Sequence, residues 1–109
     1  MINHIVLFRF KKSISNQEIN QVFESIKELA SMFPGISNFS WGKNSNQEKM
    51  SVGYEYALFL QFDSEETRTK YQQHPFNEKI SKEIVIPALC TQTNPAVVFD
   101  FSCNDRVSA

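Results

Sequence analysis

Apolar and polar residues alternate along four segments of the chain and recur at helical spacing along two others. The alternation predicts strands over residues 3–11, 36–43, 54–62 and 96–101, because successive strand side chains point to opposite faces. The helical spacing predicts a long helix from residue 15 to the Pro34-Gly35 pair and another over residues 76–86 that Pro87 ends. A short helix over 64–74 leads into the latter.

The long helix has the clearest start signal in the chain. Ser15 and Glu18 have the spacing of a capping box, and the flanking Ile14 and Ile19 occupy the two positions of a hydrophobic staple. We therefore expect the helix to begin at Ser15.

The strand over residues 54–62 runs directly into the short helix. Asp63 stands where an N-cap belongs, with Glu66 three residues later as its capping-box partner. Pro75 disfavours helical geometry at His74, so the helix is expected to end there. This arrangement brings Tyr71 and His74 close to the strand.

The order strand, helix, strand, strand, helix, strand predicts an α+β fold, the ferredoxin-like βαββαβ sandwich, with four antiparallel strands and the helices on one face. The other face is left without cover. Ile5, Leu7, Ala57 and Phe59 would lie on it, forming an apolar patch larger than a monomer usually exposes. A homodimer that buries this face is the simplest prediction.

The composition and charge of the chain limit the classes of partner that the protein is expected to bind. The chain has 109 residues, a net charge of -1 and no cluster of Lys and Arg, which argues against nucleic acid as a partner. Neither a signal peptide nor an apolar run of membrane-spanning length is recognisable, so a cytoplasmic protein without a membrane partner is expected. Cys90 and Cys103 lack metal-ligand spacing and are expected to be free thiols. The ten Phe residues are expected to fill the core, or alternatively to line a ligand pocket.

Short motifs along the chain resemble those of the stress-responsive A/B barrel family, also called the dimeric α/β barrel domain. The matching residues are His4, Phe8 to Lys11, Pro34-Gly35, Trp41-Gly42-Lys43, Gly53-Tyr54, Phe62, Tyr71, His74-Pro75 and Phe99-Asp100-Phe101. The resemblance implies a family domain over residues 1–101, followed by a polar C-terminal tail over 102–109. It also implies homodimers whose two sheets close into a barrel.

The resemblance further implies a pocket between the sheet and the helices, where polyketide cyclases of this family act without a cofactor or a metal. His4 and Tyr71 match pocket residues of those enzymes and are the candidate catalytic residues. Asn77 and Tyr56 stand where the cyclases carry histidines, so the general base of that reaction is missing. The expected substrate-binding residues are Val6, Phe8, Val22, Phe23, Ile26, Tyr56, Leu58 and Asn77.

The sequence is compatible with two functions. The first is a barrel that binds a small hydrophobic molecule without catalysis. The second is a cofactor-independent enzyme acting on a hydrophobic carbonyl compound, as a polyketide cyclase-like lyase or a quinone-forming monooxygenase, with His4 as the group that moves a proton. His4 can equally be a core histidine satisfied by one hydrogen bond, and Tyr71 can be core packing.

Overall fold

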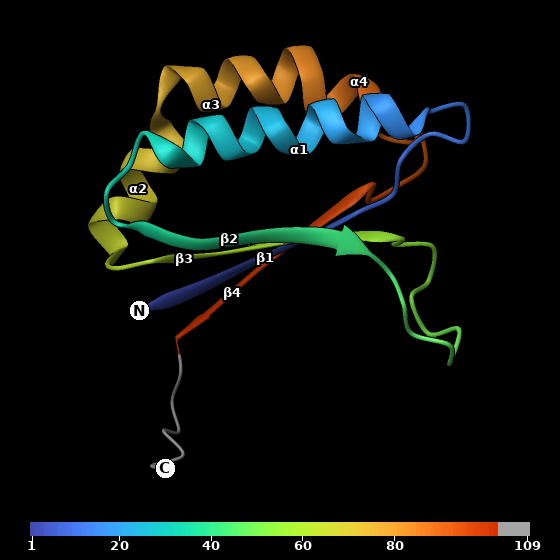
Figure 1. Cartoon of the computed structure of the whole chain (residues 1–109), viewed down its shortest axis with the longest axis horizontal. Helices are drawn as coiled ribbons and strands as arrows, with labels where there is room; N and C mark the ends of the chain where they lie inside the picture. Colours follow the sequence, from blue (N-terminus) through green and yellow to red (C-terminus); the bar gives the residue numbers. More distant parts are fainter. Residues whose placement is uncertain (103–109) are drawn as a thin grey trace.

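The computed structural model describes residues 1–102, with residues 103–109 outside the description. Its strands are β1 (Ile2–Phe8), β2 (Ile36–Lys43), β3 (Tyr56–Phe62) and β4 (Ala96–Ser102). Its helices are α1 (Asn16–Ser31), α2 (Glu65–Gln73), α3 (Pro75–Ile80), the π-helix η1 (Ser81–Val85) and α4 (Ile86–Ala88). Figure 1 shows two layers, with α1 and the run from α3 to α4 side by side above the sheet.

The four strands form one antiparallel sheet in the order β2-β3-β1-β4. This order, with both helical segments on one face, is the ferredoxin-like α+β fold, so the predicted fold class is confirmed. β1 lies at the centre of the sheet between β3 and β4. Its residue His4 stands opposite Leu60 on one side and Asp100 on the other.

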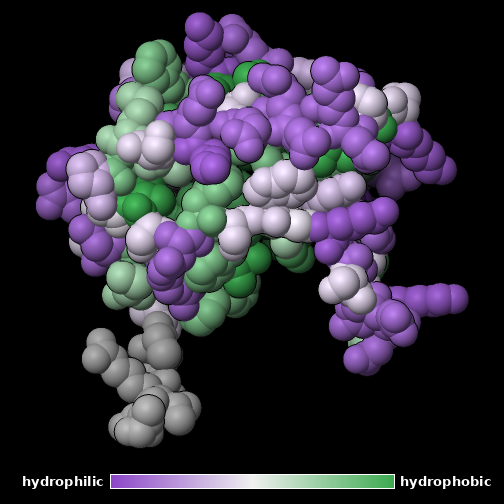
Figure 2. Space-filling model, in the orientation of Figure 1, coloured by the Kyte–Doolittle hydropathy of each residue, from purple (hydrophilic) through white to green (hydrophobic). Residues whose placement is uncertain are grey.

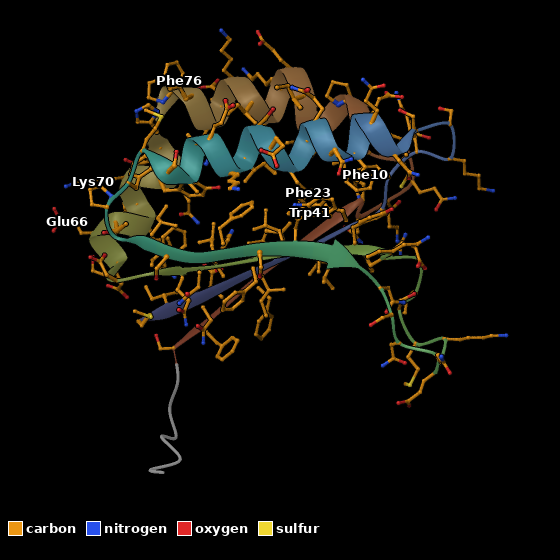
Figure 3. The ribbon with its side chains drawn as sticks, in the orientation of Figure 1. Phe10, Phe23, Trp41, Glu66, Lys70 and Phe76 are labelled. Atoms are coloured by element: carbon orange, nitrogen blue, oxygen red, sulfur yellow. The ribbon has the colours of Figure 1, made fainter. Side chains whose placement is uncertain are left out.

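The core fills the space between the helices and the sheet. Its largest fully buried side chains are Val22 and Phe23 from α1 and Leu58, Leu60 and Phe62 from β3. Phe23 points from α1 toward the sheet, where its ring stacks on Trp41 with 4.2 Å between the ring centroids (Figure 3). Aromatic stacking between α1 and β2 therefore helps to hold the two layers together.

The expected capping box of α1 is present. The Ser15 hydroxyl accepts a hydrogen bond from the Glu18 backbone N–H, and the Glu18 carboxylate accepts one from the Ser15 backbone N–H. Ile19 is buried in the core and Ile14 packs against it. Both residues of the predicted staple therefore anchor the start of α1 to the core.

The predicted cap of α2 is wrong by one residue. Ser64 is the N-cap, and its hydroxyl accepts from the Thr67 backbone N–H. The Asp63 carboxylate instead accepts a hydrogen bond from the Thr67 hydroxyl, and the Asp63 backbone N–H donates to the Gly35 carbonyl. Glu66 pairs with Lys70 on the outer surface and takes no part in a capping box (Figure 3).

Two other predicted elements differ in detail. β1 ends at Phe8, before the predicted end at residue 11. The Arg9 backbone N–H still donates to the Pro95 carbonyl, but Pro95 has no N–H to donate in return. The Arg9 carbonyl accepts from the Cys90 N–H instead. The predicted helix over residues 76–86 exists but contains the π-helix η1, in which the Ile86 N–H bonds the Ser81 carbonyl. Pro87, one residue later, has no N–H to continue a regular ladder.

The sheet face opposite the helices carries uncovered apolar side chains. Ile5 stands between Phe59 and Phe99 across the strands, and Leu7 stands between Ala57 and Val97. The side chain of Phe99 is 60% exposed and that of Phe101 is 43% exposed. Figure 2 shows hydrophilic residues over the outer helical layer and hydrophobic residues along the underside of the sheet. The expected apolar patch is therefore present on the protomer.

Three further expectations from the sequence concern a membrane-spanning segment, the cysteines and the C-terminal tail. Over residues 1–102, no helix combines the length and the apolar composition that crossing a bilayer requires. Cys90 is a free thiol, whereas Cys103 lies outside the described residues. Ser102 ends β4, so the tail expected over 102–109 lies outside the description from residue 103 on.

Candidate functional site

A cavity of about 370 Å³ lies between the sheet and the helices. Its polar lining side chains are His4, Tyr71, Gln72, Asn77 and Ser81. The remaining lining residues are apolar: Val6, Phe8, Ile26, Leu29, Leu58, Ile80, Val85, Ile86, Leu89, Ala96 and Val98. The cavity is thus mainly apolar, with polar groups supplied by β1, α2, α3 and η1.

His4 is held by a carboxylate from the neighbouring strand. Its side chain is buried, and its Nδ1 lies 2.5 Å from Oδ1 of Asp100. The second oxygen of Asp100 accepts from Nη1 of Arg68 at 3.4 Å. The three side chains therefore form a chain of hydrogen bonds from the surface to the cavity wall.

The Asp100 carboxylate sets the tautomer of His4. An ionised carboxylate only accepts hydrogen bonds, so Nδ1 of His4 carries the proton. Nε2 is then the nitrogen with a lone pair, available to accept a proton or a hydrogen bond inside the cavity. A carboxylate that orients an imidazole in this way is a recurrent device in acid-base catalysis and ligand binding.

Tyr71 supplies the second candidate group. Its ring stands edge-on to the His4 ring, with 6.4 Å between the centroids, and only 6% of the residue is exposed. Burial raises the pKa of Tyr71 from 10.0 to about 12, because the low-dielectric surroundings disfavour the phenolate. The phenol therefore remains a hydrogen-bond donor at neutral pH.

Asn77 is fixed by hydrogen bonds on both sides of its amide. Its Nδ2 donates to the Tyr71 backbone carbonyl at 3.0 Å, and its Oδ1 accepts from the Ser81 hydroxyl at 3.2 Å. An amide held in this way can orient a ligand but has no proton to exchange near neutral pH.

The predicted site residues separate into two groups. His4, Val6, Phe8, Ile26, Leu58, Tyr71 and Asn77 all line the cavity. Val22, Phe23 and Tyr56 lie outside its lining. Phe23 and Tyr56 contact each other and Trp41 in the aromatic core, and Val22 is almost fully buried on α1. Packing between the layers accounts for these three residues.

The roles of the other polar groups of the site were not predicted from the sequence, although the Phe99-Asp100-Phe101 motif contains Asp100. Asp100 and Arg68 orient His4, and Ser81 fixes Asn77. An acidic residue at a helix-facing position of the otherwise apolar β4 was the signal available for Asp100. His74, in contrast, caps α3, since its Nδ1 accepts from the Phe76 backbone N–H.

Over residues 1–102, no three side chains among His, Cys, Asp and Glu lie together in a group that would hold a metal ion. The chemistry available to the cavity is that of an oriented imidazole, a buried phenol and an amide.

Comparison with known proteins identifies the family and the fold of the chain. The chain is 27% identical over 74 residues to olivetolic acid cyclase from Cannabis sativa, a match that covers 68% of the chain and 73% of the cyclase. Among solved structures, hydroxynitrile lyase from Passiflora edulis superposes with a TM-score of 0.81 at 24% identity, covering 98% of this chain and 96% of the lyase.

A dimeric ferredoxin-like protein of unknown function from Jannaschia sp. CCS1 superposes with a TM-score of 0.80 at 20% identity, covering 94% of this chain and 98% of that protein. The model of the stress responsive A/B barrel domain matches residues 2–103, which is nearly the whole chain. The chain therefore belongs to the stress responsive A/B barrel domain family.

Proposed function

We propose that this protein binds a small hydrophobic molecule carrying a carbonyl or hydroxyl group in the cavity between its sheet and its helices. The observation that carries the proposal is the cavity itself, which is apolar apart from a few polar side chains that include His4 and Tyr71. Ligand sites of proteins are usually concave and mostly apolar, with a small number of placed polar groups.

The volume of the cavity limits the ligand. At about 370 Å³ it stands at the small end of the range of roughly 300–1,000 Å³ typical of ligand pockets. A single substituted ring or a short acyl chain fits this volume. The Tyr71 phenol and Nε2 of His4 would then hydrogen-bond its one polar group, while Phe8, Leu58 and Val85 contact the apolar part.

Catalysis on such a ligand is the second candidate function. His4, oriented by Asp100, is suited to take a proton from a carbon next to a carbonyl, and Tyr71 is suited to donate a hydrogen bond to the oxygen that gains charge. Olivetolic acid cyclase and hydroxynitrile lyase, to which the chain is similar, are named for enzyme activities. This supports a cofactor-independent lyase or cyclase more than a quinone-forming monooxygenase.

We further propose that the protein works as a homodimer in the cytoplasm. The uncovered apolar face of β1, β3 and β4 supports the dimer, since a second copy would bury Phe59 and Phe99. Several structurally similar proteins are described as dimeric.

Native mass spectrometry of protein purified gently from its own cells tests the binding proposal. The expected result is a mass increment that denaturation releases as a hydrophobic compound. Val98→Trp should lower the bound fraction, because Val98 lines the cavity and is 59% exposed at its mouth. Met32→Trp, on an exposed apolar residue outside the cavity, is the matched control and should leave the bound fraction unchanged.

The same preparation separates the two candidate functions. If the isolated compound is returned to the protein and recovered unchanged, simple binding is supported. If it is converted, and His4→Gln and Tyr71→Phe each stop the conversion, the enzyme is supported. Equal occupancy in the wild-type protein and Val98→Trp would contradict a ligand in this cavity.

A further inference from the structure

A second, larger hollow lies beyond the end of β1, separate from the cavity described above. Its volume is about 580 Å³. It is formed where the chain leaves β1, where it enters β3, and where it approaches β4. Its lining residues are Arg9, Phe10, Lys11, Lys12, Val52, Gly53, Glu55, Cys90, Thr91 and Gln92. We call this hollow the basic cleft.

Arg9 is held rigidly at the wall of the basic cleft. Its guanidinium lies over the Tyr54 ring, with the central carbon 4.3 Å from the ring centroid. Tyr54 is itself fixed, because its hydroxyl donates to the Asn94 carbonyl at 2.7 Å. Gly53 lies against the Arg9 side chain and has a φ of +87°, a left-handed conformation that glycine adopts without strain.

The positive charges of the basic cleft form no ion pair in the described part of the chain. Nη1 of Arg9 donates to the Thr93 carbonyl at 3.5 Å, and Lys11 lies near enough to Glu18 to help lower the pKa of that carboxyl. Across residues 1–102, every ion pair joins other side chains, and none includes Arg9, Lys11 or Lys12. Nε of Arg9 is moreover buried without any hydrogen-bond partner in that range. A buried donor left without a partner is rare in native proteins, and a bound water or ion is one way to satisfy it.

We propose that the basic cleft binds the phosphate group of a small organic phosphate. Three cationic side chains against the single carboxylate of Glu55 leave a net charge of +2 in the lining. A phosphate monoester carries about −1.5 to −2 at neutral pH, which matches that charge, whereas a monocarboxylate leaves an excess. The planar fork of arginine suits phosphate oxygens, and Lys11 and Lys12 add point charges.

The apolar part of the lining indicates an organic substituent. Phe10 and Val52 face the same hollow as the cations, and Val52 is 73% exposed on the protein without a ligand. The volume of the cleft exceeds that of a lone phosphate ion, so an organic group can contact these two side chains while the phosphate meets Arg9.

Calorimetric titration of the full chain with phenyl phosphate, and separately with inorganic phosphate, tests the proposal at low ionic strength. Saturable binding of either supports the site. Tighter binding of phenyl phosphate assigns the ligand as an organic phosphate, and equal affinity assigns it as free phosphate. Arg9→Gln should weaken binding about 10-fold or more, the effect of losing charge-assisted hydrogen bonds. Lys27→Met, which removes a charge from the outer face of α1, is the matched control and should leave affinity within about twofold.

Two outcomes would overturn the site: absence of saturable binding of both compounds, or equal weakening by Lys27→Met and Arg9→Gln. Because Arg9 packs on Tyr54, its replacement can disturb folding, so Lys12→Met on an exposed residue gives a second variant. Its affinity should fall about threefold to fivefold at low salt, and an unchanged affinity counts against the proposal. Peptide-resolved thiol labelling gives an independent readout, since phenyl phosphate should slow modification of Cys90 in the lining.

Discussion

Nδ1 of His4 lies 2.5 Å from Oδ1 of Asp100, directly across the pair of strands β1 and β4, although 96 positions separate the two residues in the chain. The contact assigns the proton to Nδ1 and leaves Nε2 for the cavity. It gives the candidate site an orientation that neither residue has alone.

Asp100→Asn should loosen that orientation. The amide of asparagine can accept a hydrogen bond from Nδ1–H or donate one to an unprotonated Nδ1, so both tautomers of His4 become available. Because the charge-assisted hydrogen bond is lost, the free energy of unfolding should fall by about 1–2 kcal/mol. Nitrogen-15 NMR of the two imidazoles reports the change. His74, whose Nδ1 accepts from the Phe76 N–H and is therefore unprotonated, is the internal control. An unaltered His4 spectrum in the variant would show that Asp100 does not set the tautomer.

Tyr71 should make the stability of the protein depend on alkaline pH. Its pKa rises from 10.0 to about 12 on burial, so the unfolded chain loses the phenol proton before the folded chain does. The contribution of Tyr71 is therefore complete below about pH 10 and is lost as the pH rises toward 12. Chemical denaturation at pH 9 and above should show a steeper loss for the wild type than for Tyr71→Phe. Parallel curves would mean that this phenol ionises freely in the folded state.

Short-range signals in the sequence predicted the helix starts better than the site. Ser15 and Glu18 form their capping box because both partners lie within one turn. The cap of α2 was misplaced by one residue. Asp63 is tied by its backbone N–H to the Gly35 carbonyl, a contact distant in the sequence, and the next residue, Ser64, caps the helix. Asp100 could not be assigned to His4 from the sequence, since that contact depends on the register of β4 against β1.

The residues that line the cavity could likewise be predicted only in part from the sequence. Alternation placed Val6, Phe8 and Leu58 on the helix-facing side, and all three line the cavity. The same reasoning cannot separate cavity from core along that face. Phe23 and Tyr56 pack into the aromatic cluster around Trp41, which only the three-dimensional position of α1 over the sheet determines.

Ser15→Ala should destabilise the protein through α1. The variant leaves the Glu18 N–H without its side-chain partner, which typically costs about 1 kcal/mol. For a domain of this size the melting temperature should fall by about 4 °C. Ser13→Ala, in the preceding turn, is the matched control and should melt within about 1 °C of the wild type. Identical melting of the two variants would indicate that the cap contributes nothing.

Phe59→Lys should break the proposed dimer. Phe59 stands beside Ile5 on the helix-free face, where a second copy would enclose it. A lysine there would bury a charge without a partner, at a cost of several kcal/mol. Sedimentation analysis should give a dimer for the wild type at micromolar concentration, with dissociation or aggregation of the variant. Lys79→Met on the outer helical layer is the control and should sediment as the wild type does; a monomeric wild type would refute the interface.

Asn77 should prevent the unmodified protein from cyclising a linear polyketide, despite the similarity to olivetolic acid cyclase. The amide lines the cavity with Tyr71 and His4, but both of its sides are occupied by hydrogen bonds and it has no proton to exchange.

Asn77→His would place a titrating group there, and general-base catalysis is worth about 10²–10⁴-fold in rate when the geometry is right. The expected outcome is no product from the wild type and measurable cyclisation of a linear tetraketide thioester by Asn77→His, detected by mass spectrometry. Asn77→Gln, which keeps an amide, is the control and should stay inactive. Turnover by the wild type that survives both His4→Gln and Tyr71→Phe would show that the chemistry of this protein lies outside the cavity.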